Sequence, residues 1–372
     1  MPRIRVLVVD DAVVMRKMIS EALGGDVQLE VVGTAANGKI ALQKIPQVNP
    51  DILTLDIEMP EMDGLQTVRE LRKTYPKLPV IMFSTLTLKG AESTFEALDA
   101  GATDYVTKPS NVGNIAEGLE RLKNELIPKI KAHCRHIPPP PPVAGAPEAS
   151  PSASASVVPT TAGTHFVAKL SPAPARTLPP AVLCIGCSTG GPNALAAVFK
   201  AITRPLPVPV VIVQHMPPLF TQMLAERLGK DSPLKFHEGQ EGQLVEAGHV
   251  YIAPGGRHME VRREGGVVRV HLHDGPPENS CRPAVDVLFR SVSTVYGGAT
   301  LALIMTGMGQ DGLHGCTVLR ERGATILDQD EATSVVWGMP GYVAEAGLAH
   351  QILPLQDIAG ALLRLLPAHL RP

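Results

Sequence analysis

Proline is concentrated in one segment of the sequence, between residues 137 and 180, where 12 of 44 residues are proline. This segment, IPPPPPVAGAPEASPSASASVVPTTAGTHFVAKLSPAPARTLPP, has little apolar periodicity. Because such a composition cannot bury enough apolar surface to offset the entropy of ordering it, we predict a disordered linker. A chain of 372 residues is long enough for two ordinary domains. We place them at 1–125 and 181–370, with 126–180 as a helix end and the linker.

Strand-like runs alternate with helix-like runs on both sides of the linker. Before it, short apolar or β-branched runs lie at 4–10, 29–35, 51–56, 79–84 and 104–108, with helical patterns such as 15–23 and 64–74 between them. After it, strand patterns lie at 181–186, 209–214, 249–254, 267–273, 301–306 and 324–329, with helical patterns at 219–229, 284–296 and 312–323. This alternation predicts an α/β chain with two doubly wound parallel sheets and an antiparallel hairpin within 249–273.

Composition excludes several classes of protein. The net charge of −2 provides no basic field for nucleic acid. No apolar stretch approaches the roughly 18 residues of a membrane span, so we expect no membrane insertion. Five cysteines in a chain of this length suggest a reducing compartment, and we predict a cytoplasmic protein. Cys184 and Cys187 form a C-x-x-C, but a cysteine inside a buried strand behaves as a small hydrophobic residue, so a redox pair is not favoured.

Charged and hydroxyl side chains follow the strands of the first domain. Asp10 and Asp11 end its first strand, Asp56 its third, Ser84 its fourth and Lys108 its fifth. Ligands of open α/β sheets bind at the carboxyl ends of the strands, so these groups should meet at one edge. Clustered carboxylates repel one another unless a hard cation such as Mg²⁺ binds among them. A carboxylate beside Mg²⁺ and a lysine is a plausible phosphoryl acceptor.

The motifs VLVVDD, TLDIEMPEMDGL, MFSTLT and GATDYVTKPS together resemble the receiver domain of two-component response regulators, which has a flavodoxin-like fold. The resemblance implies that Asp56 accepts a phosphoryl group from a histidine kinase. It also implies that Mg²⁺ is bound by Asp10, Asp11 and Asp56 and by the backbone carbonyl of Glu58.

The same resemblance assigns roles near the phosphoryl group. It implies that Ser84, where the family often has threonine, senses the phosphate. Lys108 is expected to pair with the phosphate, across a cis peptide bond to Pro109, and Tyr105 stands at the position of the switching aromatic. A receiver controls an activity without being that activity, so the function must lie in the second domain.

Ser188 lies in GCSTGGP, between an apolar strand and a helix-forming run. A serine at such a turn can be a nucleophile, part of an anion-binding nest, or only a structural turn. His215 directly follows the next strand, and Asp311 follows the strand LALIMT through a glycine-rich loop. All three side chains should therefore emerge at one sheet edge, where a serine–histidine–aspartate system can assemble.

Other histidines are weaker candidates. His271 and His273 point the same way on one strand, which permits a metal site, but no third and fourth ligand lies near them in the sequence. His258 follows a strand-end turn, where it either lines a pocket or is a hydrogen-bonded loop histidine.

Six spaced motifs after the linker resemble the catalytic domain of the CheB family of chemotaxis protein-glutamate methylesterases. They are GCSTGGP, VIVQHMP, VYIAPGGRHMEV, RPAVDVLFRS, LIMTGMGQDG and DQDEATSVVWGMP. The resemblance implies a Rossmann-like three-layer domain with Ser188, His215 and Asp311 as the catalytic triad. Two departures are Ala284, where the family usually has serine, and Cys281, where histidine is frequent. We expect both to affect only the pocket rim.

The resemblance also implies the substrate and the partners. The substrates are glutamyl γ-methyl esters on methyl-accepting chemoreceptors, with methanol as product and receptor glutamine deamidation as a second activity. A chemotaxis-type histidine kinase is the phosphodonor, and the esterase needs no cofactor of its own. The backbone N–H groups of Thr189 and Met308 are candidate oxyanion donors. The alternative is a response regulator with a non-catalytic output that binds a ligand or nucleic acid.

Overall fold

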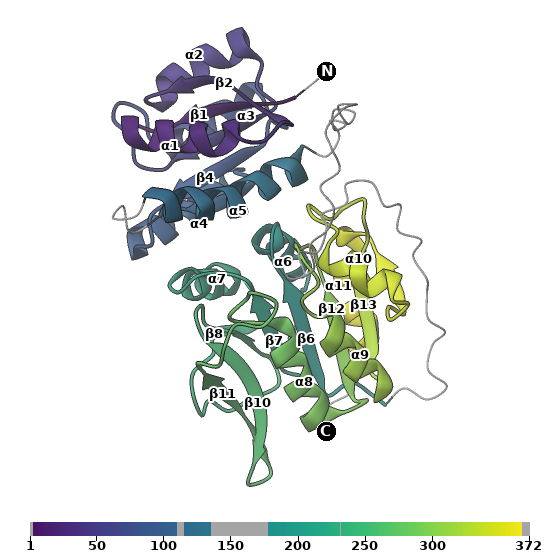
Figure 1. The fold of residues 1–372 in the computed structure, drawn as a ribbon. Coiled ribbons are helices and arrows are strands. Elements are labelled where there is room, and N and C mark those ends of the chain that lie inside the picture. Colours follow the sequence, from purple (N-terminus) through teal and green to yellow (C-terminus); the bar gives the residue numbers. More distant parts are fainter. Residues whose placement is uncertain (1–2, 110–114, 135–177, 231, 367–372) are drawn as a thin grey trace. The chain divides into compact units, whose positions relative to one another are not determined.

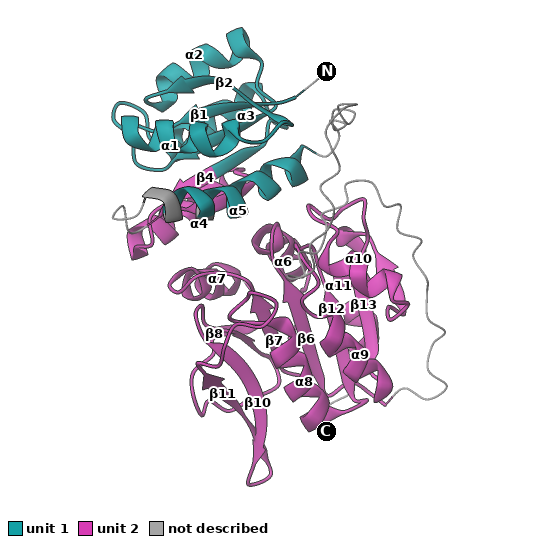
Figure 2. Cartoon of the chain, in the orientation of Figure 1, with its two compact units in different colours: residues 1–81, 111–166 teal, residues 82–110, 167–372 magenta. Residues whose placement is uncertain are grey.

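The structure is a computed structural model that describes residues 3–109, 115–134, 178–230 and 232–366 (Figure 1). Two compact units divide the chain: residues 1–81 with 111–166, and residues 82–110 with 167–372 (Figure 2). Residues 137–177 of the predicted linker lie outside the described residues, so the linker and the boundaries at 125 and 180 stay predictions. None of the helices in the described ranges combines the length and the apolar character needed to cross a membrane.

The first sheet has five strands in the order β2-β1-β3-β4-β5. Its elements are β1 (Ile4–Val9), α1 (Val13–Gly24), β2 (Leu29–Ala35), α2 (Gly38–Val48), β3 (Ile52–Asp56), α3 (Gly64–Thr74), β4 (Val80–Ser84), α4 (Leu88–Asp99), β5 (Asp104–Thr107) and α5 (Ile115–His133). Strand β1 pairs in parallel with both β2 and β3. This is the flavodoxin-like strand order, which confirms the predicted fold of the first domain.

The second sheet has seven strands in the order β14-β13-β12-β6-β7-β9-β8, and every pair is parallel. Its strands are β6 (Val182–Cys187), β7 (Val210–Gln214), β8 (Lys235–Glu238), β9 (His249–Ile252), β12 (Thr300–Ile304), β13 (Thr325–Gln329) and β14 (Gln351–Leu353). The helices are α6 (Gly191–Lys200), α7 (Phe220–Gly229), α8 (Val285–Tyr296), α9 (Leu313–Glu321), α10 (Met339–Glu345) and α11 (Leu355–Leu365). The predicted doubly wound parallel sheet is confirmed.

The predicted hairpin within 249–273 is present but shorter than that range. It consists of β10 (His258–Glu264) and β11 (Val267–His273), which pair antiparallel, whereas β9 joins the parallel sheet. The edge strands β8 and β14 were not predicted. They have only 4 and 3 residues, too few for a period-2 pattern to be recognised.

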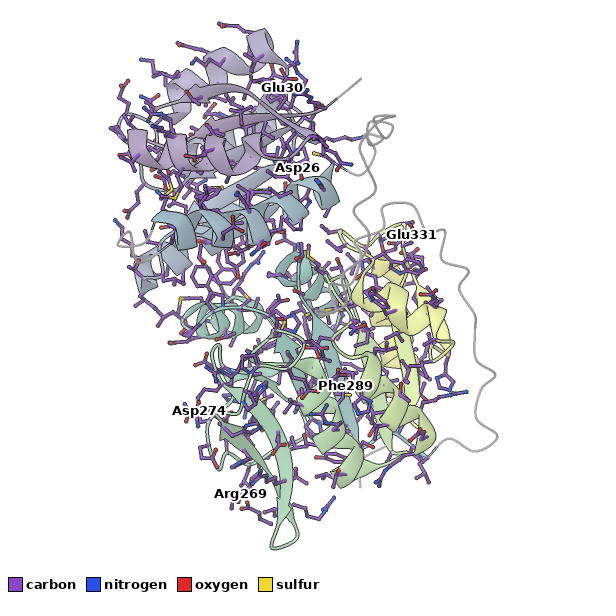
Figure 3. All side chains as sticks on the ribbon, in the orientation of Figure 1. Asp26, Glu30, Arg269, Asp274, Phe289 and Glu331 are labelled. Atoms are coloured by element: carbon purple, nitrogen blue, oxygen red, sulfur yellow. The ribbon has the colours of Figure 1, made fainter. Side chains whose placement is uncertain are left out.

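The central strands of the second sheet are buried on both faces, as expected of a parallel sheet with helices on each side (Figure 1). Val182 and Cys184 of β6 lie in one core cluster with Phe289 of α8, a residue labelled in Figure 3. Leu183 and Ile185 are equally buried but alternate to the opposite face. The resulting layers of helix, sheet and helix agree with the predicted three-layer domain.

Strand β6 lies between β7 and β12. Strands β7, β9 and β8 extend the sheet on one side of β6 and strands β12, β13 and β14 extend it on the other, so the strand order reverses between β6 and β12. The crevice outside the carboxyl ends of the strands at such a switch point is where open α/β sheets bind ligands. Ser188 follows β6, His215 follows β7, and Asp311 lies in the loop after β12. The topology therefore brings all three predicted site residues to the switch point.

Candidate active site

Ser188 lies on a tight turn between β6 and α6. Its backbone N–H donates to the Thr306 carbonyl at 3.0 Å, and its own carbonyl accepts from Gly191 N–H at 2.8 Å. Gly190 has a φ of +79°, and a Cβ there would lie 2.7 Å from Val335. A side chain at Gly307 would come within 2.8 Å of the Ser188 Cβ. Glycines thus allow the neighbouring backbone to close tightly around the serine.

His215 is tied to the same turn. Its backbone N–H donates to the Cys187 carbonyl at 3.2 Å. The Gln214 side chain donates to the Ser188 carbonyl at 2.9 Å and to the His215 carbonyl at 3.2 Å. The imidazole Nε2 lies 2.8 Å from Asp311 Oδ2, whereas Nδ1 lies 3.5 Å from the Sγ of Cys281. Nδ1 is therefore the ring nitrogen that remains for proton transfer with Ser188.

The Asp311 carboxylate accepts four hydrogen bonds. Oδ2 accepts from His215 Nε2 at 2.8 Å and from Val285 N–H at 2.6 Å. Oδ1 accepts from Asp286 N–H and from Asn279 Nδ2, both at 3.0 Å. Val285 and Asp286 are the first two residues of α8. Asp311 thus satisfies two of the free amides at the N-terminus of this helix, where an anion is favoured.

Ala284 is the N-cap residue of α8 and provides no side-chain hydrogen bond. A serine at this position is a common helix cap. Here the caps come from elsewhere, because Asp311 accepts from the helix amides and His258 Nδ1 accepts from the Ala284 N–H at 3.3 Å. Ala284 is fully buried. The expectation that it belongs to the pocket rim is therefore wrong.

Cys281 was also expected at the rim, with no effect on the catalytic positions, and that expectation is wrong. The segment after β11 folds back so that the Cys281 thiol contacts His215, 66 positions away in the sequence. Among the described residues, the Ser188 hydroxyl makes no hydrogen bond to the imidazole. In this structure the Cys281 thiol is the group that contacts Nδ1 of His215.

Two supporting residues were missed by the sequence analysis. Asn279 donates from Nδ2 to both Asp311 at 3.0 Å and Asp286 at 2.9 Å. Asp286 in turn accepts from Gly312 N–H at 3.0 Å and Gly315 N–H at 2.6 Å, which fixes the chain directly after Asp311. The only signal in the sequence was an acidic residue in the first turn of a helix, which is ordinary for helices.

The charges of His215 and Asp311 reinforce one another. Burial opposes protonation of His215, but its hydrogen bonds to Asp311 and Cys281 outweigh burial and raise its pKa to about 10. Burial disfavours the charged form of Asp311, yet the hydrogen bond and charge of His215 and the α8 amides hold the pKa of this carboxyl below its usual value. Each partner thus favours the charged form of the other.

The candidate oxyanion donors flank Ser188. Thr189 is buried, and its carbonyl accepts from the Thr306 hydroxyl at 2.9 Å. Met308 follows Gly307, at which an added Cβ would lie 2.8 Å from the Ser188 Cβ, and it is exposed. Within the described residues, neither the Thr189 N–H nor the Met308 N–H makes a hydrogen bond, so both stay candidates.

The carboxylates of the first sheet gather as predicted. Asp10, Asp11 and Asp56 each offer an oxygen atom, and these atoms all lie within 4.8 Å of one another. Asp10 and Asp56 are buried, whereas Asp11 is exposed. Three carboxylate oxygens at this spacing are the donor chemistry that Mg²⁺ prefers. Glu58 follows in the exposed turn after β3.

Ser84 and Lys108 are joined through the backbone, because Lys108 N–H donates to the Ser84 carbonyl at 2.7 Å. The Ser84 hydroxyl is buried, donates to the Gly90 carbonyl at 3.0 Å and accepts from Thr94 at 2.8 Å. It must leave the Gly90 carbonyl to donate to a phosphate. Among the described residues the cis peptide bond is Arg282–Pro283, so the cis bond expected at Lys108–Pro109 is absent.

Comparison with known proteins gives two family matches. A model described as CheB methylesterase matches residues 183–362, and a model described as response regulator receiver domain matches residues 6–120. A protein-glutamate methylesterase/protein-glutamine glutaminase of Trichodesmium erythraeum is 49% identical over 98% of this chain and 99% of its own length. The chain belongs to the CheB methylesterase family.

A second CheB relative, from Nocardioides, bears the same name and is 50% identical over 100% of this chain and 98% of its own length. Among solved structures, the CheB methylesterase catalytic domain of Thermotoga maritima is 39% identical, with 50% of this chain and 100% of that chain covered and a TM-score of 0.49. The family assignment confirms the predicted class of enzyme, a carboxylic ester hydrolase behind a receiver domain.

The other histidines and cysteines considered in the sequence analysis make contacts that are typical of structural residues. His258 is buried and satisfied at both ring nitrogens, by Ala284 N–H and the Pro276 carbonyl, which supports the hydrogen-bonded alternative, although it begins strand β10 and is not in a loop. His271 contacts Glu241 at 3.0 Å, and His273 lies 3.8 Å from Glu260. Cys184 and Cys187 are free and buried, and burial raises the pKa of both thiols.

Proposed function

We propose that Ser188, His215 and Asp311 are the nucleophile, the general base and the orienting acid of a methylesterase that hydrolyses glutamyl γ-methyl esters on chemoreceptors. The observation that carries this proposal is the imidazole of His215, bound through Nε2 to Asp311 and tied by Gln214 to the Ser188 turn. The family supports the class of reaction, and the relatives' names supply the ester of protein glutamate as substrate.

In the acylation step, Ser188 Oγ attacks the ester carbonyl while His215 Nδ1 takes its proton. Nε2 keeps its proton because it donates to Asp311, and the carboxylate then stabilises the imidazolium that forms. The N–H groups of Thr189 and Met308 would stabilise the oxyanion. Methanol leaves with the proton from Nδ1, and a water molecule then releases the glutamate by the reverse path.

The same machinery can act on an amide, with ammonia as leaving group. The names of the relatives include protein-glutamine glutaminase. We include receptor glutamine deamidation in the proposed function, with ester hydrolysis as the faster reaction. A non-catalytic binding output is not favoured, because the second domain belongs to a methylesterase family.

Control of the esterase is proposed to lie in the receiver domain. Asp56 would accept the phosphoryl group from a chemotaxis-type histidine kinase, with Asp10, Asp11 and the Glu58 carbonyl holding Mg²⁺. When bound, Mg²⁺ neutralises negative charge on the phosphoryl oxygens. Ser84 and Lys108 would contact the phosphoryl group. We propose that the enzyme and the kinase meet in the cytoplasm.

Replacing Asp56 by asparagine should abolish activation by phosphorylation while leaving basal hydrolysis. The measurement is methanol release from methylated receptor membranes, with and without a small-molecule phosphodonor and Mg²⁺. Glu70→Gln is the matched control, because it removes one carboxylate from an exposed site on α3 where Glu70 pairs with Lys73. Activation that survives in Asp56→Asn would refute Asp56 as the acceptor.

The activity should rise with pH. His215 must be neutral to accept the serine proton, and its pKa is raised to about 10, so kcat/KM should increase from neutral pH toward pH 10. The raised pKa stabilises the fold at pH values below the unfolded value of about 6.5, and that stabilisation is lost as the pH rises through the folded value. Methanol release by Ser188→Ala measures alkaline background hydrolysis at each pH. A flat profile after this subtraction would contradict the assignment of His215.

A further inference from the structure

Cys281 is held in place by a short turn. Its N–H donates to the Glu278 carbonyl at 2.9 Å, and Glu278 N–H donates to the Cys281 carbonyl at 3.0 Å. The two residues between them, Asn279 and Ser280, have left-handed backbone with φ of 52° and 63°. Such conformations are uncommon outside glycine and persist only where the surroundings fix them.

Side chains anchor this turn to α8. Glu278 accepts two hydrogen bonds from Arg290, at 2.5 and 2.7 Å, and Asn279 donates to Asp286 and Asp311. The backbone of Cys281 is therefore fixed relative to Asp311, and its Sγ lies 3.5 Å from the Nδ1 of His215.

A nucleophile is activated when it contacts a base and that base in turn contacts an orienting acid. Sγ of Cys281, the imidazole of His215 and the carboxylate of Asp311 form this series, with Nδ1 on the sulfur side and Nε2 on the carboxylate side. Ser188 needs the same Nδ1. The active site thus holds two potential nucleophiles for one base.

A metal ion is a poorer explanation of this cluster. Both oxygens of Asp311 are engaged in four hydrogen bonds, two of them from the N-terminus of α8. The carboxylate also contacts the opposite nitrogen of the ring from the thiol. A metal at Nδ1 and Sγ would have to break these bonds to gain Asp311 as a third ligand. The contacts favour a reactive thiol.

The other four cysteines provide an internal comparison. Cys134, Cys184, Cys187 and Cys316 are buried, whereas Cys281 is partly exposed. Burial raises the pKa of all four buried thiols, to about 12 for Cys134, and keeps them protonated and inert. Among the described cysteines, Cys281 alone combines access to solvent with a base.

We propose that Cys281 is a modification site, at which a thiol activated by His215 reacts with hydroperoxides and thereby switches off the esterase. His215 Nδ1 takes the thiol proton, and the thiolate attacks one peroxide oxygen. The O–O bond breaks, sulfur is oxidised by two electrons to a sulfenic acid, and the leaving hydroxide takes the proton from Nδ1 to form water. The added oxygen lies against the nitrogen that Ser188 needs, so methanol release stops.

The direct test is to expose the full-length protein to hydrogen peroxide, trap sulfenic acid with dimedone and map the adduct by mass spectrometry. We expect the label on Cys281 before any of the four buried cysteines. Methanol release, measured on parallel samples without dimedone, should fall in proportion to the labelled fraction and return with dithiothreitol. If Cys281 is labelled no faster than the buried cysteines, the proposal is overturned.

Two variants separate activation from simple exposure. Cys281→Ala should resist inactivation by peroxide, whereas the matched control Cys134→Ala should remain as sensitive as the wild type. His215→Gln should slow labelling of Cys281, because the base is lost while the thiol stays exposed. Peroxide inactivation that persists in Cys281→Ala would refute the proposal. The proposal rests on His215 as the esterase base. Labelling of Cys281 is measured without the methanol assay, so a failure of the proposed esterase function and a failure of the proposed thiol modification can be recognised separately.

Discussion

Replacing Ser188 by alanine should lower the rate of methanol release by about 10⁴-fold or more, because the nucleophile and its base act as a unit. The fold should tolerate the change. Among the described residues the Ser188 hydroxyl makes no hydrogen bond, and the Cβ that lies against Gly307 is retained in alanine. Thermal unfolding should therefore stay close to that of the wild type.

The measurement is methanol release from methylated receptor membranes, with phosphodonor present in every sample. Equal release by wild type and Ser188→Ala would exclude Ser188 as the nucleophile. Residual release that disappears in the double variant Ser188→Ala/Cys281→Ala would identify the thiol as a substitute nucleophile on the same base. An anion-binding nest, the competing interpretation of this turn, would survive the alanine change, because its donors are backbone N–H groups.

Replacing Asp311 by asparagine should lower kcat by about 10³–10⁴-fold and also destabilise the fold. An amide nitrogen facing Nε2 would donate to it and force the proton onto Nδ1, where the imidazole can no longer accept the proton of Ser188. Each oxygen of Asp311 now accepts a hydrogen bond from an N–H of α8. The amide nitrogen of asparagine cannot accept one, so in either orientation one N–H of α8 loses its acceptor. Each buried donor left without an acceptor costs about 1–3 kcal/mol.

Asp286→Asn is the matched control for this prediction. It makes the same isosteric change in a neighbouring buried carboxylate that accepts from Gly312 and Gly315 but does not contact His215. It should cost stability, measured by urea unfolding, with a far smaller loss of kcat. Equal losses of kcat in the two variants would mean that Asp311 acts only through the fold.

The positions of the three residues of the proposed triad could be predicted because each follows a strongly apolar strand. Carboxyl ends of parallel strands meet at one edge, so the order of strands and loops was enough to bring Ser188, His215 and Asp311 together. The same reasoning placed Asp10, Asp11 and Asp56 in one cluster, whose oxygens lie within 4.8 Å of one another.

The segment before α8 could not be predicted, because it has no periodicity. The place of Cys281 depends on two left-handed residues and on the pairing of Glu278 with Arg290, which are tertiary effects. Which nitrogen of His215 faces the carboxylate also depends on the packed ring and not on spacing. The role of Asp286 was hidden, since an acid in the first turn of a helix is common.

The bonds that Asp311 makes to the start of α8 have a consequence for the descent of such enzymes. Helix α8 carries Phe289 into the main core, so Asp311, the group proposed to orient the catalytic base, also secures a part of the scaffold. A lineage that abandons ester hydrolysis can lose its serine freely, but it can lose this aspartate only with a compensating cap on α8. Inactive descendants of this fold should therefore keep the acid long after the nucleophile has gone.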